Sequence, residues 1–459
     1  MARRFICAAV LLVVGAASAD IEIPGLPPEA AGTDGTLVSN SHLMIDLGKA
    51  QSGAGITWQS PGGDVDNDGI ADGVYDPAVH AVVFKYSGVS LGGGGYWLQF
   101  TNHPKGASVV WLVTGNVTLT SQHYISLTGG NSQGSSGFAV PGPGGFRGAR
   151  GGVGETPASG GFGPGGGDFL QDIGWGGGSF GEPGGAYSVP AAPTYNNVFI
   201  LPLIGGSGGA GWSNGGGGAG GGAIMIVCTG TVTLNGAIYA NGGGGNNYGA
   251  GGAGGAIRII ADQIIGNSSG VLRAQGGGGG YDTVGGRGRI FLQANYINMS
   301  DVGDPAAVKT NFAQSPYLIW PDSTDPGFPD VPPTPKIWPV SLTVDGTVHL
   351  IRDDPSAAFE QPGTEVSFDT TNPVTLQISA AYVPLDWKVI VRVVAAAGSS
   401  FTVEAPALAG SLEASSTEAV IESLPRGFGA IQVRAYDPDR GVSLPTQATV
   451  RPAPSEAAP

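Results

Sequence analysis

The chain has 459 residues, a formal net charge of −15, 84 glycines and two cysteines. This acidic balance disfavours nucleic acids and anionic membranes as partners, because both attract basic surfaces. The glycines follow no strict Gly-X-Y period, which excludes a collagen triple helix.

Residues 1–19 are predicted to be a secretory signal peptide. Arg3 and Arg4 supply a positive start, an apolar stretch follows over Phe5–Val14, and small residues precede a cleavage point after Ala19. The apolar stretch is shorter than the ~20 residues that span a bilayer, and no later stretch is apolar enough to do so. We therefore expect a secreted, extracellular or cell-surface protein with no transmembrane segment. The alternative is a buried N-terminal helix.

Cleavage after Ala19 would also change what can hold the mature chain together. Cys228 would be the one remaining cysteine, and 18 basic against 35 acidic residues would give a net charge of −17. An intramolecular disulfide is then impossible, so packing, backbone pairing or a metal ion must stabilise the fold.

Residues 20–105 are expected to form an N-terminal cap, or the first irregular strands, of the repeat region that follows. They contain an Asp-rich loop with carboxylates at loop positions 1, 3, 5 and 9 and a glycine at position 6, which resembles the first part of a calcium loop. The predicted calcium ligands are Asp64, Asp66, Asp68, the backbone carbonyl of Ile70, Asp72 and Asp76. Asp76 lies one residue beyond position 12, which Tyr75 occupies. The alternative is a solvated acidic turn without a cation.

Residues 106–312 contain a repeat that predicts a parallel β-solenoid. Segments that begin at Gly222, Gly255 and Gly288 carry apolar residues at alternate positions and start 33 residues apart. The segment Ile224–Leu234 also aligns without gaps on Val109–Leu119. A period of two is typical of strands, and a fixed repeat of this length is typical of stacked coils. A disordered glycine-rich chain is the alternative, but it does not explain the identical spacing of the apolar rows.

Cys228 falls on the inward row of this repeat, where we expect it to act as a small core hydrophobe. A glycine-rich insertion over 131–221, with prolines and scattered aromatic residues, interrupts the repeat. Two interpretations of the insertion stay open. It forms either extended, polyproline II-like segments packed along the solenoid or a flexible loop.

The remaining residues predict a Pro-rich linker over 313–339, a β-sandwich module over 340–451 and a disordered tail over 452–459. In the module the glycine content falls and short strand-like runs recur between turns, as in Ig-sized sandwiches. The expected strands are Val340–Val344, Thr375–Ile378, Lys388–Val394, Ala419–Ile421 and Ala430–Ala435. The predicted fold class is therefore all-β: a glycine-rich parallel β-solenoid with a C-terminal Ig-like β-sandwich.

The motifs favour a non-enzymatic protein. Ser179 and Ser207 each lie in a G-x-S-x-G stretch, but this motif indicates a nucleophile only at a strand-to-helix turn, and no helix is expected. The outward rows of the repeat also lack the paired carboxylates that glycoside hydrolysis uses.

At Ala223–Val227 and Gly254–Ala261 the chain resembles glycine-rich secreted bacterial surface proteins of unassigned function. The resemblance covers roughly residues 60–300 and implies a β-solenoid and export, but no activity. Many of these proteins have a C-terminal sorting anchor, which we do not expect in this chain. We expect a structural or adhesive protein, stabilised by calcium, with polysaccharide or cell-surface components as partners. The alternative is a carbohydrate-binding or polysaccharide-degrading β-helix protein that uses aromatics such as Trp97, Trp175 and Trp212.

Overall fold

The computed structural model describes most of the chain from Ile23 onward. The described residues are 23, 26–77, 79–135, 137–196, 198–299, 303–310, 336–350, 372–395, 398–423, 429–437, 442–444 and 449–450. The predicted signal peptide, most of the predicted linker and the predicted tail lie outside them. Within these ranges the fold is all-β as predicted, with no α-helix and two single-turn 3-10 helices, η1 (Leu47–Lys49) and η2 (Gly280–Asp282).

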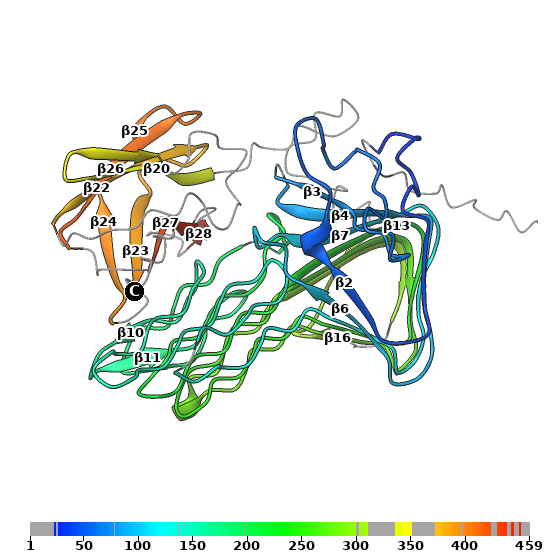
Figure 1. Ribbon diagram of the computed structural model, residues 1–459, viewed down its shortest axis with the longest axis horizontal. Coiled ribbons are helices and arrows are strands. Elements are labelled where there is room, and N and C mark those ends of the chain that lie inside the picture. The colour runs from blue at the N-terminus through cyan, green and yellow to red at the C-terminus, as the bar shows by residue number, and fades with distance from the viewer. Residues whose placement is uncertain are drawn as a thin grey trace, which may run out of the picture.

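Two sheets of largely parallel strands form the body on the right of Figure 1. The larger sheet has ten strands: β1 (Thr36–Ser39), β3 (Val74–Asp76), β4 (Ala81–Tyr86), β5 (Gly88–Leu91), β7 (Ser108–Val113), β8 (Val117–Leu119), β13 (Ala223–Leu234), β15 (Ala256–Ile265), β17 (Arg289–Asn298) and β19 (Val308–Thr310). The smaller sheet has six: β2 (Leu43–Asp46), β6 (Trp97–Thr101), β9 (Tyr124–Ser126), β14 (Ala237–Tyr239), β16 (Val271–Arg273) and β18 (Gly303–Asp304). The β3–β4 pair is antiparallel, and the other pairings in these two sheets are parallel.

The strand register follows the repeat found in the sequence. Ile224 pairs with Ile257, and Ile257 pairs with Ile290, a step of 33 residues each time. β7 pairs with β13 in the same way, with Val109 beside Ile224. The alignment of the two segments on each other is therefore confirmed as a physical pairing, although the long insertion separates them in the chain.

One hydrophobic cluster joins the inward side chains of both sheets. Trp111 in β7, Ile238 in β14 and Ile257 in β15 are fully buried in it. Cys228 lies in the same cluster beside Ala261, and burial raises the pKa of its thiol to about 11. The thiol therefore stays protonated at neutral pH and packs as a small core hydrophobe, as the sequence predicts.

The residues expected to cap the repeat region contribute strands to both sheets. β4 lies parallel to β7, with Val82 beside Val109, and β5 lies parallel to β8, with Val89 beside Val117. β2 and β6 extend the smaller sheet in the same direction. Residues of this region therefore continue both sheets by parallel pairing.

The glycine-rich segments form a second body, the glycine bundle, which extends from the sheets to the lower left of Figure 1. It includes the insertion and also the two long hairpins that connect β14 to β15 and β16 to β17. Its segments are extended apart from turns and bends such as those at 143–144, 163–165 and 180–182, and for the most part they have no strand assignment: 127–134, 139–151, 158–167, 176–185, 204–211, 215–222, 240–246, 249–255, 274–279 and 283–288. Three short strands, β10 (Phe169–Leu170), β11 (Gly174–Gly176) and β12 (Ala186–Tyr187), form a small antiparallel sheet at its far end.

Segment 215–222 shows how the bundle is held together. Its amides donate in a rotating order: Gly218 and Gly221 to the carbonyls of Ala250 and Ala253, Gly217 and Gly220 to those of Ala149 and Phe146, and Ala219 and Gly222 to those of Gly130 and Leu127. Every third residue thus bonds to the same neighbouring segment, which is the period of a polyproline II helix. Of the two interpretations of the insertion, the structure shows extended segments, but in the bundle these pack mainly on one another rather than along the parallel sheets.

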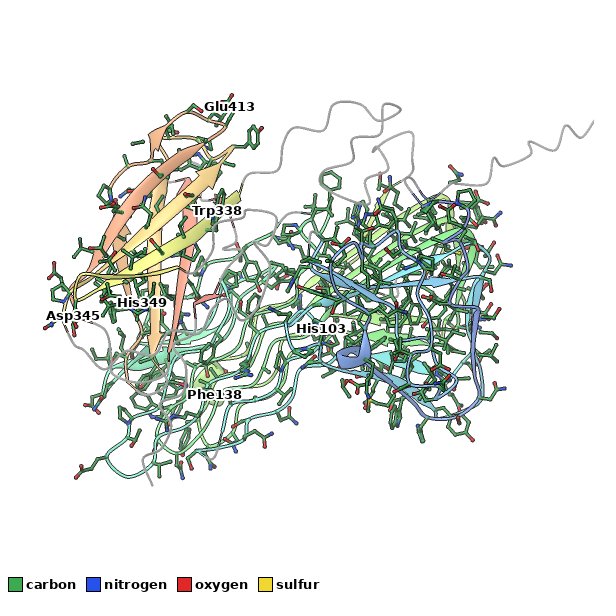
Figure 2. All side chains as sticks on the ribbon, turned by 45° about the horizontal axis from the view of Figure 1, so that its top comes forward. His103, Phe138, Trp338, Asp345, His349 and Glu413 are labelled. Carbon is green, nitrogen blue, oxygen red and sulfur yellow. The ribbon has the colours of Figure 1, made fainter. Side chains whose placement is uncertain are left out.

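Close approach of the backbones explains the glycines. A Cβ added at Gly220 would overlap the carbonyl oxygen of Gly206, and one added at Gly277 would overlap that of Gly243. Only glycine allows the segments to come this near to each other. We call the two largely parallel sheets the stacked sheets. Figure 2 shows that they carry many side chains, whereas the bundle carries few along its length.

The C-terminal strands form two antiparallel sheets that share a separate hydrophobic core. Their strands are β20 (Lys336–Val344), β21 (Thr347–Leu350), β22 (Val374–Ala381), β25 (Ala409–Gly410) and β26 (Ser415–Ile421) in one sheet, and β23 (Lys388–Ala395), β24 (Phe401–Ala405), β27 (Gly429–Asp437), β28 (Val442–Leu444) and β29 (Thr449–Val450) in the other. All five expected strands fall within observed ones. β20 begins inside the segment expected to be linker, and its register shifts after Pro339, which has no N–H to donate.

Candidate functional site

Three of the predicted calcium ligands come together in the Asp-rich loop. Carboxylate oxygens of Asp64, Asp66 and Asp72 lie within 4.8 Å of one another. The loop closes on itself because Asp64 accepts hydrogen bonds from the amides of Asp68 at 3.0 Å and Gly69 at 2.8 Å. Gly69 has a φ of 85°, so the sharp turn at this position needs the conformational freedom of glycine. Three carboxylates at this spacing form an oxygen-rich group of the kind that calcium prefers.

Asp72 is the buried member of the group. It is 5% exposed, and its Oδ2 accepts a hydrogen bond of 2.6 Å from the amide of Val65. Burial raises the pKa of Asp72; the hydrogen bond from Val65 opposes this change, and the neighbouring loop carboxylates add to it. A cation bound between the carboxylates would favour the charged form and reverse the shift.

The other predicted ligands lie differently. The Oδ1 atom of Asp68 accepts a 2.8 Å hydrogen bond from the amide of Ile70, and Asp68 is not part of the group of three. The side chain of Ile70 packs against the core of the stacked sheets. Asp66 also has a basic neighbour, since Lys49 Nζ lies 3.6 Å from its Oδ2.

Asp76 is directed into a different, buried cluster that the sequence did not indicate. It is 3% exposed at the end of β3 and accepts a 2.6 Å hydrogen bond from the amide of Trp58. The fully buried Lys85 donates from Nζ to the carbonyl of Trp58 at 3.2 Å. Burial lowers the pKa of Lys85, whereas the charges of Asp34 and Asp76 raise it. The charge of Asp76 therefore offsets part of the cost of burying this lysine.

Ser179 and Ser207 are structural residues of the glycine bundle. Both are fully buried. Ser179 Oγ donates to the carbonyl of Ala192 at 2.6 Å and accepts from the amide of Gly184 at 2.9 Å. Ser207 Oγ lies 2.9 Å from the hydroxyl of Tyr195 and accepts from an amide at 3.0 Å. These hydroxyls link backbone segments, and the surroundings are not the strand-to-helix turn of a nucleophile.

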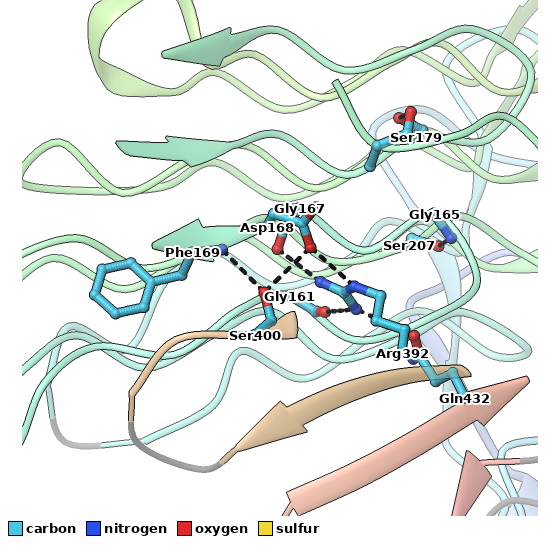
Figure 3. Close-up of polar contacts among 11 residues, drawn as sticks. Gly161, Gly165, Gly167, Asp168, Phe169, Ser179, Ser207, Arg392, Ser400 and Gln432 are labelled. Carbon is cyan, nitrogen blue, oxygen red and sulfur yellow. Dashed lines mark hydrogen bonds and ion pairs between the residues drawn. The ribbon is translucent and has the colours of Figure 1, made fainter. Parts of the chain in front are cut away.

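Arg392 of β23 joins the C-terminal sheets to the glycine bundle (Figure 3). It is 5% exposed, and its Nε donates to Asp168 Oδ1 at 3.0 Å. Its two terminal nitrogens donate to the carbonyls of Gly161 at 2.9 Å and Gly167 at 3.0 Å and to the side chain of Gln432 at 3.1 Å. A guanidinium group can make this set of bonds because its donors lie in a rigid plane.

Ser400 completes this contact. Its Oγ donates to Asp168 Oδ1 at 3.1 Å and accepts from the amide of Phe169 at 3.2 Å, while its own amide donates to the carbonyl of Phe169 at 3.0 Å. The side chain of Val394 packs on Phe146 and Phe162 of the bundle. The C-terminal sheets are therefore docked on the bundle by polar and apolar contacts and not by the linker alone.

Aromatic side chains line the outer face of the smaller sheet. The inward residues Leu98, Ile125 and Ile238 are fully buried, so their neighbours in each strand point outward. Outward rings in successive strands include half-buried Trp97, Tyr124 and Tyr239. The rings of Tyr124 and Tyr239 are 5.6 Å apart, and the guanidinium of Arg273 lies 5.9 Å from the centre of the Tyr239 ring.

Comparison with known proteins assigns no family. No protein-family model, no curated protein and no solved structure matches the chain. A search for membrane spans found no helix of sufficient length and apolarity in the described part of the chain.

Proposed function

We propose that the chain is an exported, non-enzymatic structural or adhesive protein of the extracellular space or cell surface. In this proposal the two largely parallel sheets are a β-solenoid with a repeat of 33 residues, and the C-terminal sheets are an Ig-like sandwich. The signal sequence at residues 1–19 supports export, and the resemblance to glycine-rich bacterial surface proteins supports the location.

The observation that carries the proposal is the continuity of the scaffold. The parallel strands continue into the glycine bundle, and the bundle is docked to the C-terminal sheets through Arg392 and Ser400. The candidate nucleophiles Ser179 and Ser207 are buried and hydrogen-bonded within this scaffold. Such an assembly suits a protein that holds surfaces apart or presents them.

We also propose that calcium binds the Asp-rich loop, with the carboxylates of Asp64, Asp66 and Asp72 as its main ligands. The short distances between their carboxylate oxygens support this proposal. Export supports it as well, because an exported protein would meet the calcium of the extracellular medium. Thermal melting of the mature chain in chelator and in excess calcium tests it. We expect a higher melting temperature with calcium, and an Asp64→Asn, Asp66→Asn variant should lose the shift. Identical melting curves of the wild type in both conditions would contradict the calcium proposal.

Two measurements test the general proposal. First, we expect the chain to be recovered outside the cell with an N-terminus at Asp20; retention inside with an intact leader would contradict export. Second, the purified chain should release no reducing ends from cellulose, xylan, mannan or chitin. Release of reducing ends by the wild type would establish an enzyme and overturn the non-enzymatic assignment.

A carbohydrate-binding protein is the second candidate, and the outer face of the smaller sheet favours it. Trp97, Tyr124 and Tyr239 follow one another along successive strands, an arrangement that suits contact with the rings of a polymer. Retention on insoluble polysaccharide that is lost in Trp97→Ala would support this candidate. Equal retention of wild type and variant would remove this face from consideration.

A further inference from the structure

A connected group of aromatic rings lies at the far end of the glycine bundle, near β10 and β11 in Figure 1. Stacking and edge contacts with ring centres 4.2–5.9 Å apart join its members. We call it the tip cluster, and it consists of Tyr248, Tyr281, Tyr187, Trp175, Trp212 and Phe169. The rings come from β10, β11, β12, η2 and the turns at Trp212 and Tyr248, so the bundle as a whole brings them together.

The tip cluster has a buried base and an exposed upper layer. Trp175 is 2% exposed and stacks on Trp212 at 4.2 Å. Tyr187, Tyr248 and Tyr281 are 43%, 54% and 59% exposed. Three neighbouring tyrosines that are open to solvent over the buried Trp175 and the half-buried Trp212 make a contiguous aromatic surface. Contiguous exposed apolar surface of this kind marks a binding site more often than isolated exposed residues do.

The backbone at this surface is unusual. Tyr248 has a φ of 74° and Tyr281 a φ of 51°, and both angles lie in the left-handed region. This conformation costs a bulky residue ~1–2 kcal/mol, whereas glycine adopts it without penalty. Asn247 and Asp282, next to these tyrosines in the chain, also have positive φ, of 41° and 60°. Strained residues of this kind gather at functional sites.

Polar groups border the rings. An open pocket of about 450 Å³ adjoins the cluster, and Phe169 and Trp212 form its apolar wall. Gln171, Asp172 and Asn214 supply amide and carboxylate groups to the same pocket, and none of the described residues that line it is basic. Asn247 and Asp282 flank the two strained tyrosines in sequence.

We propose that the tip cluster binds a neutral polysaccharide chain. The faces of pyranose rings are apolar and pack on aromatic rings, while their hydroxyls donate to carboxylates and amides at the rim. An anionic polymer would meet the carboxylates of Asp172 and Asp282 and the negative charge of the whole chain. This inference rests on the adhesive function proposed above, because it names the surface and the class of partner.

Affinity electrophoresis of the full mature chain tests the proposal, with cellulose derivative, xylan, mannan or mixed-linkage β-glucan cast into the gel. The test variants are Tyr248→Gly, Tyr281→Gly and the double substitution. We expect at least one polysaccharide to retard the wild type, and the double variant to bind at least tenfold more weakly. Glycine relieves the left-handed strain, so the melting temperature should stay the same or rise. Tyr296→Ala is the matched control, because Tyr296 is 53% exposed but belongs to β17.

Four outcomes would overturn the proposal. Retardation of the double variant equal to that of the wild type would place polysaccharide binding elsewhere on the protein. If Trp97→Ala then abolished the retardation, the adhesive function would stand without the tip cluster as its site. Lost retardation with a lower melting temperature would give the tyrosines a packing role only. A wild type that no neutral polysaccharide retards overturns the inference but not the structural function, which export and melting test separately. Binding to a cell-surface protein through the same tyrosines would overturn the choice of ligand.

Discussion

The stacked sheets and the glycine bundle both have a closely packed interior, but different groups fill it. In the sheets, side chains such as Trp111 and Ile257 fill a core, and pairing repeats every 33 residues. In the bundle, the interior is backbone: amides of glycine donate to carbonyls of neighbouring segments, and each direction recurs every third residue. One region is stabilised mainly by apolar burial and the other mainly by hydrogen bonds between closely packed chains.

This difference predicts different sensitivities to substitution. Apolar burial falls off gradually as methylene groups are removed. An interior made of backbone has no side-chain volume that a substitution could remove, and it has no room for an added side chain. We therefore expect the sheets to respond to smaller residues and the bundle to larger ones.

The largest effect is expected for Gly220→Val in the bundle. The added Cβ would overlap the carbonyl oxygen of Gly206, and backbone on several sides prevents the segment from moving away. The loss of stability should exceed both the ~1–3 kcal/mol that is common for overpacked side-chain cores and the ~2–5 kcal/mol of a buried Ile→Ala truncation, measured by thermal or chemical unfolding of the mature chain.

Gly278→Ala is the control for this prediction. It lies in segment 274–279 of the same bundle, yet a Cβ there has no heavy atom within 4 Å. Its stability should match that of the wild type. Wild-type stability of Gly220→Val as well would show that the bundle is pliable and would remove the contrast with the sheets.

The next largest effect is expected for Ile257→Ala in the stacked sheets. Ile257 is fully buried between Ile224 and Ile290, so truncation leaves a cavity and should cost ~2–5 kcal/mol. Ile257→Val, which removes one methylene, should cost ~0.5–1.5 kcal/mol. Chemical unfolding measures both. Equal losses for the two variants would contradict a core whose stability follows buried volume.

The sequence predicted the sheets better than the bundle, for a physical reason. Apolar residues at alternate positions, such as Ile224, Ile226 and Cys228, indicate which face of the strand points inward. The recurrence of this row after 33 residues predicts which strand lies beside it and in which register. Glycine has no side chain, so a run of glycines has no polar and apolar pattern from which the neighbouring segment could be predicted. The sequence indicated polyproline II-like packing as one alternative, but it gave no sign that Gly220 would lie beside Gly206.

The candidate site divides in the same way. Alternation of aspartates was enough to bring Asp64 and Asp66 together with Asp72. It did not reveal that Asp76 and the buried Lys85 would both bond to the backbone of Trp58, because Trp58 reaches them only through the long-range fold. The strained tyrosines of the tip cluster were hidden for a similar reason, since left-handed backbone at Tyr248 and Tyr281 is a property of the assembled turns.

A moderate effect is expected where the bundle meets the C-terminal sheets. Arg392→Met removes hydrogen bonds to Asp168 and to two glycine carbonyls, which should weaken docking by ~1–3 kcal/mol while both cores stay folded. Small-angle X-ray scattering should show a larger radius of gyration, and proteolysis between the two parts should become faster.

Lys388→Met is the matched control for the docking contact. Lys388 also lies in β23, but its ion pair with Glu404 has side chains that are 47% and 54% exposed, and such pairs contribute ~0–1 kcal/mol. Its scattering profile should equal that of the wild type. If Arg392→Met also kept the wild-type profile, the docked arrangement would not depend on this residue.

The smallest effect is expected at Asp72, and its sign depends on calcium. The folded state raises the pKa of Asp72 above its usual value. The contribution of this carboxyl to stability is therefore complete below the unfolded pKa and is lost as the pH rises through the folded pKa. Above the folded pKa and without calcium, ionised Asp72 opposes folding, so Asp72→Asn should be neutral or stabilising by less than ~1 kcal/mol.

With calcium bound, the carboxylate of Asp72 would be favoured, and the same substitution should lower the melting temperature. The amide oxygen of asparagine can still accept the hydrogen bond from Val65, so the comparison isolates charge from loop closure. A decrease in stability of equal size in chelator and in calcium would contradict a cation site at this loop. A change of sign between the two conditions would make the Asp-rich loop a third kind of stabilising element, in which charge replaces both the apolar core of the sheets and the backbone interior of the bundle.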